Sequence, residues 1–179
     1  MTFLFSQRPT RKCGGMTLVE IMIATAVGSV VMAAVMSLWL YSARSFVAMG
    51  NYADLDRVSR NALDLMSREI RSTRSLSSFS TNTLQFVDYD NTPLTYSYSP
   101  DTRQLVRVKG TASQVLLQQC DFLAFHISQR NPSNNFTFYP TTAVSQAKLI
   151  DVSWRCSREI LGAKVNTESV QTAKIVIRN

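Results

Sequence analysis

One carboxylate, Glu20, lies in an apolar run that carries no other charge before Arg44. A charge inside an apolar helix of bilayer length is costly, so Glu20 is predicted to have a functional role. Cutting the chain after Gly15 would free the amine of Met16, four residues and one helical turn from Glu20. A carboxylate near a helix N-terminus is also favoured by the helix dipole. We therefore expect Glu20 to pair with a cation, either its own amine or that of an adjacent subunit.

The small pair Gly14-Gly15 precedes the apolar run, whereas an ordinary secretory signal has its cleavage site after that run. The segment up to Gly15 contains Arg8, Arg11 and Lys12 and no acid, so its removal lowers the formal charge from +7 by three, to +4. Basic residues beside a membrane helix stay in the cytoplasm, which predicts that the C-terminal part lies outside the inner membrane.

The hexapeptide Gly15-Met16-Thr17-Leu18-Val19-Glu20 resembles the prepilin cleavage and methylation motif of type IV pilins and type II secretion pseudopilins. The family usually has phenylalanine where this chain has Met16. The resemblance implies that a prepilin peptidase/methyltransferase cuts between Gly15 and Met16 and methylates the new N-terminus of Met16. It also implies that Glu20 pairs with the amine of a neighbouring subunit during filament assembly.

A weaker resemblance extends to residues 62–71, 104–107 and 177–179, which look like minor pilins of the PilW type and their pseudopilin J relatives. It implies a structural subunit, not an enzyme, that primes or caps a type IV pilus or a type II secretion pseudopilus. The implied partners are other pilins or pseudopilins, the inner-membrane assembly platform, and membrane lipid before assembly.

The positioning element for Glu20 is predicted to be a long helix from about Thr17 to Arg74. Residues 21–41 are almost all apolar and would span about 31 Å as a helix, close to a hydrocarbon core of about 30 Å. Trp39 and Tyr41 suit the distal membrane interface. Small residues recur every fourth position on one face, which would let a neighbouring helix approach closely; they are Thr25, Ser29, Ala33 and Ser37.

Beyond Arg44 the helix becomes amphipathic, with an apolar stripe that we expect to pack on a globular domain. Gly50 is a position where this helix could bend. We predict an α+β, pilin-like fold in which the long N-terminal helix packs on an antiparallel β-sheet domain. The expected parts are a cleaved leader (1–15), a transmembrane and assembly helix (16–43), an amphipathic spine helix (44–75) and a β-rich domain (76–179).

The serine- and threonine-rich segment 75–82 is predicted to be a linker. Short alternating segments after it predict a three-stranded antiparallel meander, at residues 83–87, 94–98 and 105–108. An apolar stretch follows, and further strands are expected before the end of the chain. The stretch is 115–128, the strands are 136–139, 149–154 and 173–177, and the loops are 131–135 and 157–169.

Three cysteines become two after processing, because Cys13 lies in the leader. A compartment outside the inner membrane permits disulfides, and bridging Cys120 to Cys156 would stabilise the fold by roughly 3–4 kcal/mol. Spacing alone leaves two unpaired buried thiols as an equal alternative, since it does not test whether the Cα atoms approach closely enough.

No other group of residues forms a strong chemical motif. His126 is the only histidine and reads as an ordinary strand residue. Asp88, Asp90 and Asn91 are most simply turn residues, with calcium binding as a minor alternative. No metal or cofactor is expected, and the spread-out basic residues do not form a nucleic-acid footprint.

Two other classes of protein fit parts of the pattern. A bitopic membrane protein with an outer binding domain would keep its full length and tolerate Gly15→Ala. A secreted enzyme or adhesin with a conventional signal would lose the apolar helix. The prepilin reading predicts a chain shortened by residues 1–15 and carrying one methyl group.

Overall fold

The computed structural model describes residues 15–133, 137–159 and 167–177. The chain divides into two compact units, Met1–Ala43 and Arg44–Asn179, and one helix, α1 (Leu18–Ser72), contributes to both. The predicted helix from about Thr17 to Arg74 is confirmed within two residues at either end. Gly50 lies within α1 and does not interrupt it.

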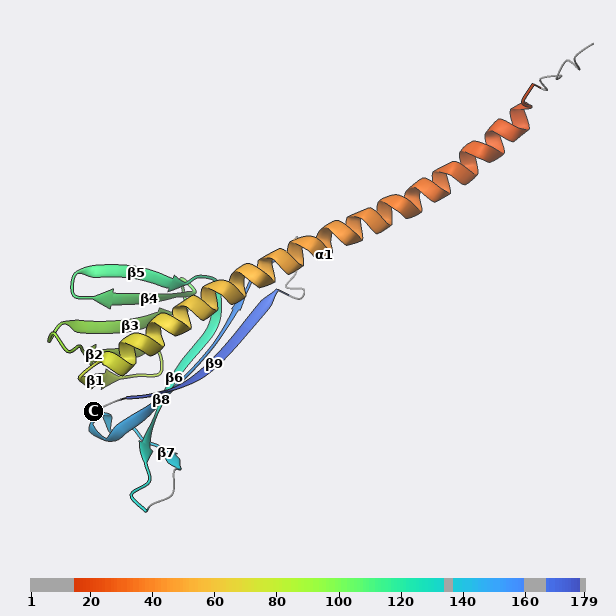
Figure 1. Cartoon of the computed structure of the whole chain (residues 1–179). Helices are drawn as coiled ribbons and strands as arrows, with labels where there is room; N and C mark the ends of the chain where they lie inside the picture. The colour runs from red at the N-terminus through yellow and green to blue at the C-terminus, as the bar shows by residue number, and fades with distance from the viewer. Residues whose placement is uncertain (1–14, 134–136, 160–166, 178–179) are drawn as a thin grey trace, which may run out of the picture. The chain divides into compact units, whose positions relative to one another are not determined.

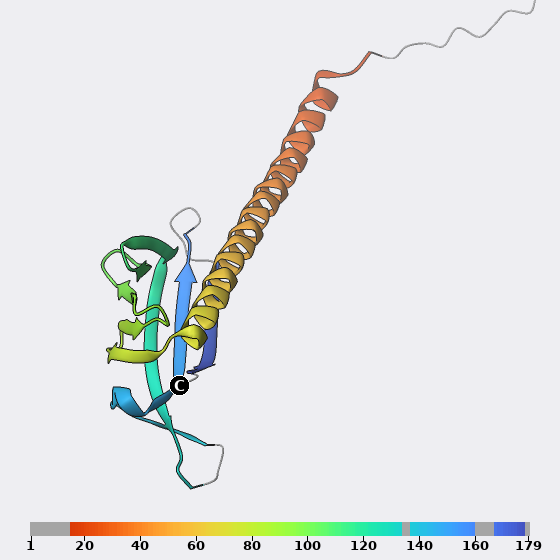
Figure 2. The ribbon, with the colours of Figure 1, turned by 60° about the vertical axis from the view of Figure 1, so that its left-hand side comes forward.

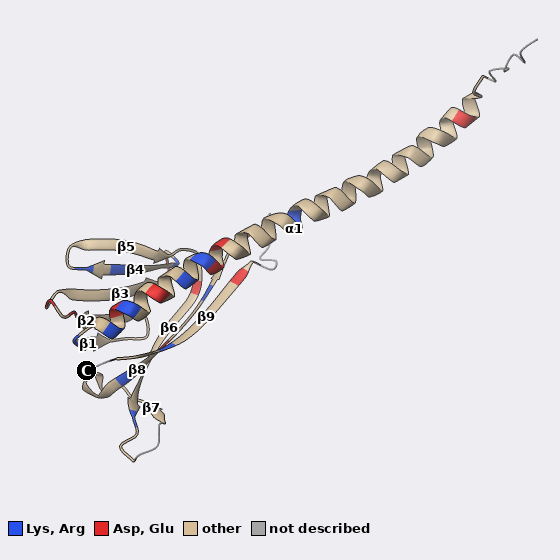
Figure 3. Cartoon of the chain, in the orientation of Figure 1, with Lys and Arg blue, Asp and Glu red and all other residues tan. Residues whose placement is uncertain are grey.

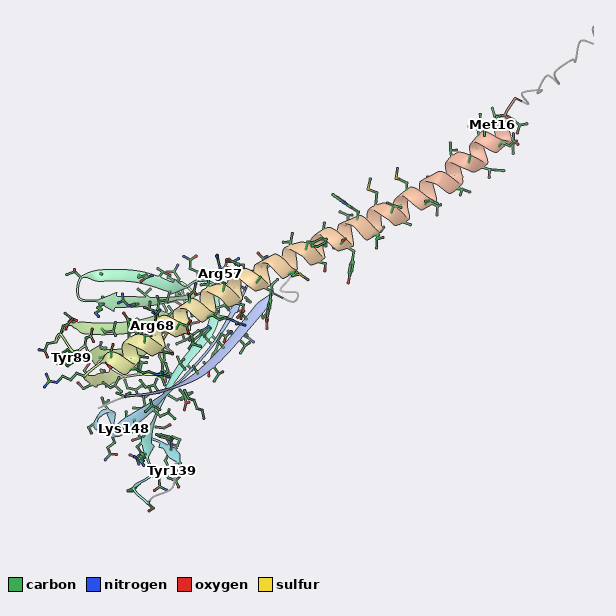
Figure 4. The ribbon with its side chains drawn as sticks, viewed as in Figure 1. Met16, Arg57, Arg68, Tyr89, Tyr139 and Lys148 are labelled. Carbon is green, nitrogen blue, oxygen red and sulfur yellow. The ribbon has the colours of Figure 1, made fainter. Side chains whose placement is uncertain are left out.

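In the first unit, α1 has no buried residue before Tyr41 and exposes its apolar side chains on every side (Figure 4). Met22, Val30 and Leu38 are each exposed by 60% or more. Such a surface needs an apolar environment, because soluble proteins rarely expose apolar patches of this extent. The helix is long and apolar enough to cross a membrane, judged by its length and composition alone.

Among the described residues of the second unit, nine strands form two antiparallel sheets, as Figure 1 shows. The first sheet is a five-stranded meander in the order β1-β2-β3-β4-β5. Its strands are β1 (Ser75–Phe79), β2 (Thr83–Val87), β3 (Pro93–Ser99), β4 (Gln104–Lys109) and β5 (Ala112–Leu117). The predicted three-stranded meander is confirmed as β2, β3 and β4.

The second sheet has the order β7-β6-β8-β9, so that β6 and β8 lie at its centre. Figure 2 shows this sheet behind the second half of α1. Its strands are β6 (Cys120–Arg130), β7 (Phe138–Pro140), β8 (Ala147–Ser157) and β9 (Glu168–Val176), with a short 3-10 helix, η1 (Val144–Gln146), before β8.

Two predicted boundaries were wrong. Residues 75–79 form β1 and not a linker, because Leu76 is buried while Ser77 and Ser78 face solvent at the sheet edge. The predicted loop 157–169 begins and ends in strands, since Ser157 closes β8 and Glu168 opens β9. Of the strand predicted at 136–139, residue 136 lies outside the described residues, and the observed strand β7 begins at Phe138.

The helix and both sheets share one hydrophobic core. The buried residues of α1 recur every third or fourth position, as expected for one face of a helix; they are Leu55, Ser59, Ala62, Met66 and Ile70. Against them pack fully buried side chains from the two sheets, including Phe86, Tyr96, Phe125, Ile150 and Trp154. The fold class is thus as predicted: a long N-terminal helix packed on antiparallel sheets.

Candidate functional site at the start of the helix

Glu20 and Thr17 hold the first turn of α1 together through a reciprocal set of hydrogen bonds. The Thr17 amide donates to the Glu20 carboxylate at 2.8 Å, and the Thr17 hydroxyl donates to the same oxygen at 2.9 Å. In return, the Glu20 amide donates to the Thr17 hydroxyl at 3.3 Å. This is a capping box, in which a threonine and a glutamate three residues later satisfy amides that the helix leaves unpaired.

The capping box could have been found in the sequence, since Thr17-Leu18-Val19-Glu20 has the required spacing. The sequence reasoning considered only a cation as the partner of Glu20 and missed it. Because α1 begins at Leu18, Met16 lies outside the helix in the uncut chain. The expected one-turn relation between Met16 and Glu20 is therefore not made in this form of the protein.

The hydroxyls on the small-residue face donate to carbonyls of their own helix. Thr25 donates to the carbonyls of Ile21 and Met22, both at 3.0 Å. Ser29 and Ser37 each donate at 2.8 Å, to Ala26 and Ala33 respectively. These polar groups are thus already satisfied and can enter an apolar environment without leaving an unpaired donor.

The second unit contains a half-buried ion pair that joins α1 to the five-stranded sheet. Arg107 of β4 makes a bidentate contact with Glu69, its Nε donating to Oε2 at 2.7 Å and its Nη2 to Oε1. The Tyr96 hydroxyl donates to the same carboxylate at 2.5 Å. Burial opposes ionisation of Glu69, but the contacts with Arg107 and Tyr96 outweigh it and lower the pKa of Glu69.

This ion pair links two of the segments that carried the weaker family resemblance, 62–71 and 104–107. Its members were not identified from sequence as partners, because they are 38 residues apart and belong to different elements. The pair fixes the orientation of the helix on the sheet and does not form a reactive centre.

The remaining candidate residues have ordinary surroundings. His126 is exposed on β6. Asp88 is buried and pairs with Lys109, with Nζ–Oδ2 at 2.5 Å, and this contact lowers the pKa of Asp88. Asn91 adopts a φ of 59° and its amide donates to the Asp88 carbonyl, as the turn prediction requires. Across the described ranges, no cluster of three or more histidine, cysteine or acidic residues could hold a metal ion.

Cys120 and Cys156 are both buried, with free thiols, and lie directly opposite each other on β6 and β8. The sequence could not establish this proximity. Cys13 lies outside the described residues.

Charged residues are concentrated in the second unit, while the first half of α1 is almost free of them (Figure 3). A basic segment therefore precedes an apolar helix whose first turn is capped by Glu20. The comparison with known protein families concerns this part of the chain. Residues 10–36 match the prokaryotic N-terminal methylation motif. The match covers the leader end, Gly15, Met16, Glu20 and most of the apolar helix, up to Met36. No curated protein and no solved structure matches the chain.

The methylation motif supports a relationship with type IV prepilins and pseudopilins. Proteins with this leader are structural subunits that a prepilin peptidase processes and that assemble with other pilins. Together with the apolar helix, the motif indicates that the chain is anchored in a membrane.

Proposed function

We propose that this protein is a minor subunit of a type IV pilus or a type II secretion pseudopilus, made as a precursor and cut between Gly15 and Met16. The observation that carries the proposal is the coincidence in register of four features: a basic leader, the Gly15–Met16 bond, Glu20, and the start of α1 at Leu18. Each feature alone is common, but a cleavage site placed directly before an apolar helix is not the arrangement of a secretory signal.

Removal of the leader has a physical purpose in this scheme. Three cations and no acid lie before the cleavage site, and they would hold the helix end at the cytoplasmic surface. After cleavage, α1 can leave lipid and pack against neighbouring helices, where Thr25, Ser29, Ala33 and Ser37 permit close approach. The domain from Arg44 onward lies in the periplasm, where it contacts other subunits and helps to prime or cap the filament.

Glu20 then pairs with the methylated amine of Met16 on a neighbouring subunit. In the uncut chain its carboxylate accepts two hydrogen bonds from Thr17. A carboxylate has about four acceptor positions, so it can keep the cap and still receive an amine. The cap would hold the carboxylate at the helix start, where the incoming amine meets it.

Intact mass of the membrane-extracted protein, made together with a prepilin peptidase/methyltransferase, tests the cleavage step. The expected chain lacks residues 1–15 and carries one added methyl group. Gly15→Ala should remain at precursor length, while the matched control Gly28→Ala should be processed normally. A methyl group added at either glycine meets no atom within 4 Å, so neither change disturbs packing. A chain that stays at full length would support the bitopic alternative, and one cut after the apolar run would support a conventional signal.

Two substitutions of Glu20 separate its charge from its capping role. Glu20→Gln removes the charge but keeps an acceptor for Thr17, because glutamine also closes a capping box. Glu20→Ala removes both. We expect both variants to be cleaved and both to fail in co-purification with filament subunits. Normal assembly of Glu20→Gln would contradict charge pairing, and normal assembly of both would exclude an assembly role for Glu20.

A further inference from the structure

The two cysteines that remain after processing occupy a non-hydrogen-bonded pair of the β6–β8 ladder. The Ser157 amide donates to the Gln119 carbonyl at 3.0 Å, which makes Gln119 and Ser157 the hydrogen-bonded pair. Cys120 and Cys156 are the next pair along. Accordingly, the Cys120 amide donates away from β8, to the Arg103 carbonyl, at 2.9 Å.

This position has the geometry that a disulfide needs. Residues in a non-hydrogen-bonded antiparallel pair have Cα atoms about 4.5 Å apart and their side chains on the same face. Disulfides join residues whose Cα atoms are about 4.4–6.8 Å apart. Cys120 and Cys156 are 0% and 1% exposed, so their side chains both point into the core.

The two thiols lie side by side in the core, on directly paired residues. The Cys120 thiol donates to the Phe122 carbonyl at 3.2 Å. The neighbouring Cys156, together with burial, raises the pKa of Cys120. The neighbouring Cys120 and Ser59 lower the pKa of Cys156. In the closed fold, Cys156 is therefore the thiol that ionises more readily.

We propose that Cys120 and Cys156 are joined by a disulfide bond in the exported protein. The thiolate of one cysteine attacks the disulfide of a thiol–disulfide exchange oxidant, forms a mixed disulfide and releases one thiol of the oxidant. The thiolate of the other cysteine then attacks the sulfur of the first and releases the second thiol of the oxidant. The two cysteines lose two electrons and two protons, and the oxidant gains them. Since both thiols are buried in the finished fold, oxidation occurs before the two sheets close over them.

The bond would secure the point where the chain passes from the five-stranded sheet to the four-stranded sheet. Only Gln118 and Gln119 separate β5 from β6, and Cys120 is the first residue after this crossing. Cys156 lies on β8, a central strand of the second sheet. Next to the pair, Asp121 accepts from Arg103 and from the Ser157 hydroxyl. A covalent bond would hold this junction closed.

In the test, the protein without its leader is unfolded in denaturant and its free thiols are labelled with a maleimide. The labelling is done with and without prior reduction. For uncut protein, Cys13→Ser removes the third thiol. We expect no maleimide on Cys120 or Cys156 until a reductant is added, and a mass lower by two hydrogen atoms before reduction. Proteolysis should yield one cross-linked peptide containing both cysteines. Cys120→Ser and Cys156→Ser should each expose one reactive thiol.

The proposal depends on the proposed function only for the oxidising surroundings, so a second measurement is independent of export. The unfolded protein is refolded with oxidised glutathione as the oxidant. Formation of the Cys120–Cys156 bond supports the proposal even if leader cleavage is never observed. Two free thiols after this refolding would overturn it, as would two free thiols in exported protein that has been cleaved normally. The double variant Cys120→Ala/Cys156→Ala, refolded in parallel, should have the same urea midpoint as the reduced native protein. Both midpoints should be lower than that of the disulfide-bonded protein.

Discussion

The two halves of α1 belong to one continuous helix but have opposite relations to their surroundings. From Leu18 to Ala43, none of its residues is buried, and its large apolar side chains are exposed. From Arg44 to Ser72, its apolar stripe is buried against two sheets and its polar side makes ion pairs such as Arg60–Asp56. The second half obtains its apolar environment from its own chain. The first half must obtain it from lipid or from other subunits, which is why an assembly role suits it.

The most sensitive test of this contrast compares two methionines on the same helix. Met66 is 0% exposed and Met36 is 54% exposed. Met66→Ala should lower the free energy of unfolding of the second unit by about 2–5 kcal/mol, because it leaves a cavity in the core. Met36→Ala should leave that free energy unchanged. Urea unfolding in detergent micelles, followed by the fluorescence of buried Trp154, measures both. Equal effects would show that the first half also packs within the chain.

The polar attachment of the second half can be broken at Arg107. Arg107→Ala leaves the half-buried Glu69 carboxylate with Tyr96 as its one hydrogen-bond donor among the described residues. Removing a charged hydrogen-bond partner should cost about 1.5–3 kcal/mol. Glu69→Gln alone should cost less, because glutamine can still accept from Tyr96. Additive effects of the two substitutions in a double-mutant cycle would contradict direct coupling.

Acid should weaken the same attachment. The pKa values of Glu69 and Asp88 are lowered by their contacts with Arg107 and Lys109. Their contribution to stability is therefore complete above the unfolded-state values of about 4.3 and 3.9, and it is lost as pH falls through the lower folded-state values. The urea midpoint should fall over that range. Arg107→Ala should reduce the pH dependence, and an unchanged dependence would assign it to other carboxylates.

The smallest expected effect concerns the start of the first half. Thr17→Ala removes the capping hydroxyl and should destabilise the first turn by about 1 kcal/mol. In the uncut protein in micelles, hydrogen exchange of the Glu20 and Ile21 amides should become about fivefold faster. Thr25→Ala, whose hydroxyl donates only to helix carbonyls, should not change it. Unchanged exchange in Thr17→Ala would show that the capping box does not hold this turn.

The sequence was most informative where one physical rule dominates. Uninterrupted apolarity predicted the helix, and alternation predicted β2, β3 and β4, because each pattern reflects burial on a known face. It failed at β1, whose serines have the composition of a loop but lie on the exposed side of an edge strand. It did not identify Glu69 and Arg107 as partners, and it left a Cys120–Cys156 bridge open, since contacts between distant elements depend on register that composition does not encode.

The hydroxyl groups of Thr25, Ser29 and Ser37 turn inward to carbonyls of their own backbone. The hydroxyl groups on this face of the helix therefore do not donate hydrogen bonds to a neighbouring helix. Sliding one such helix along another would break no hydrogen bond, so these residues contribute little to the axial register between neighbouring helices. If neighbouring helices pack with a fixed axial offset, that offset must be set by Glu20 and by the folded C-terminal domains.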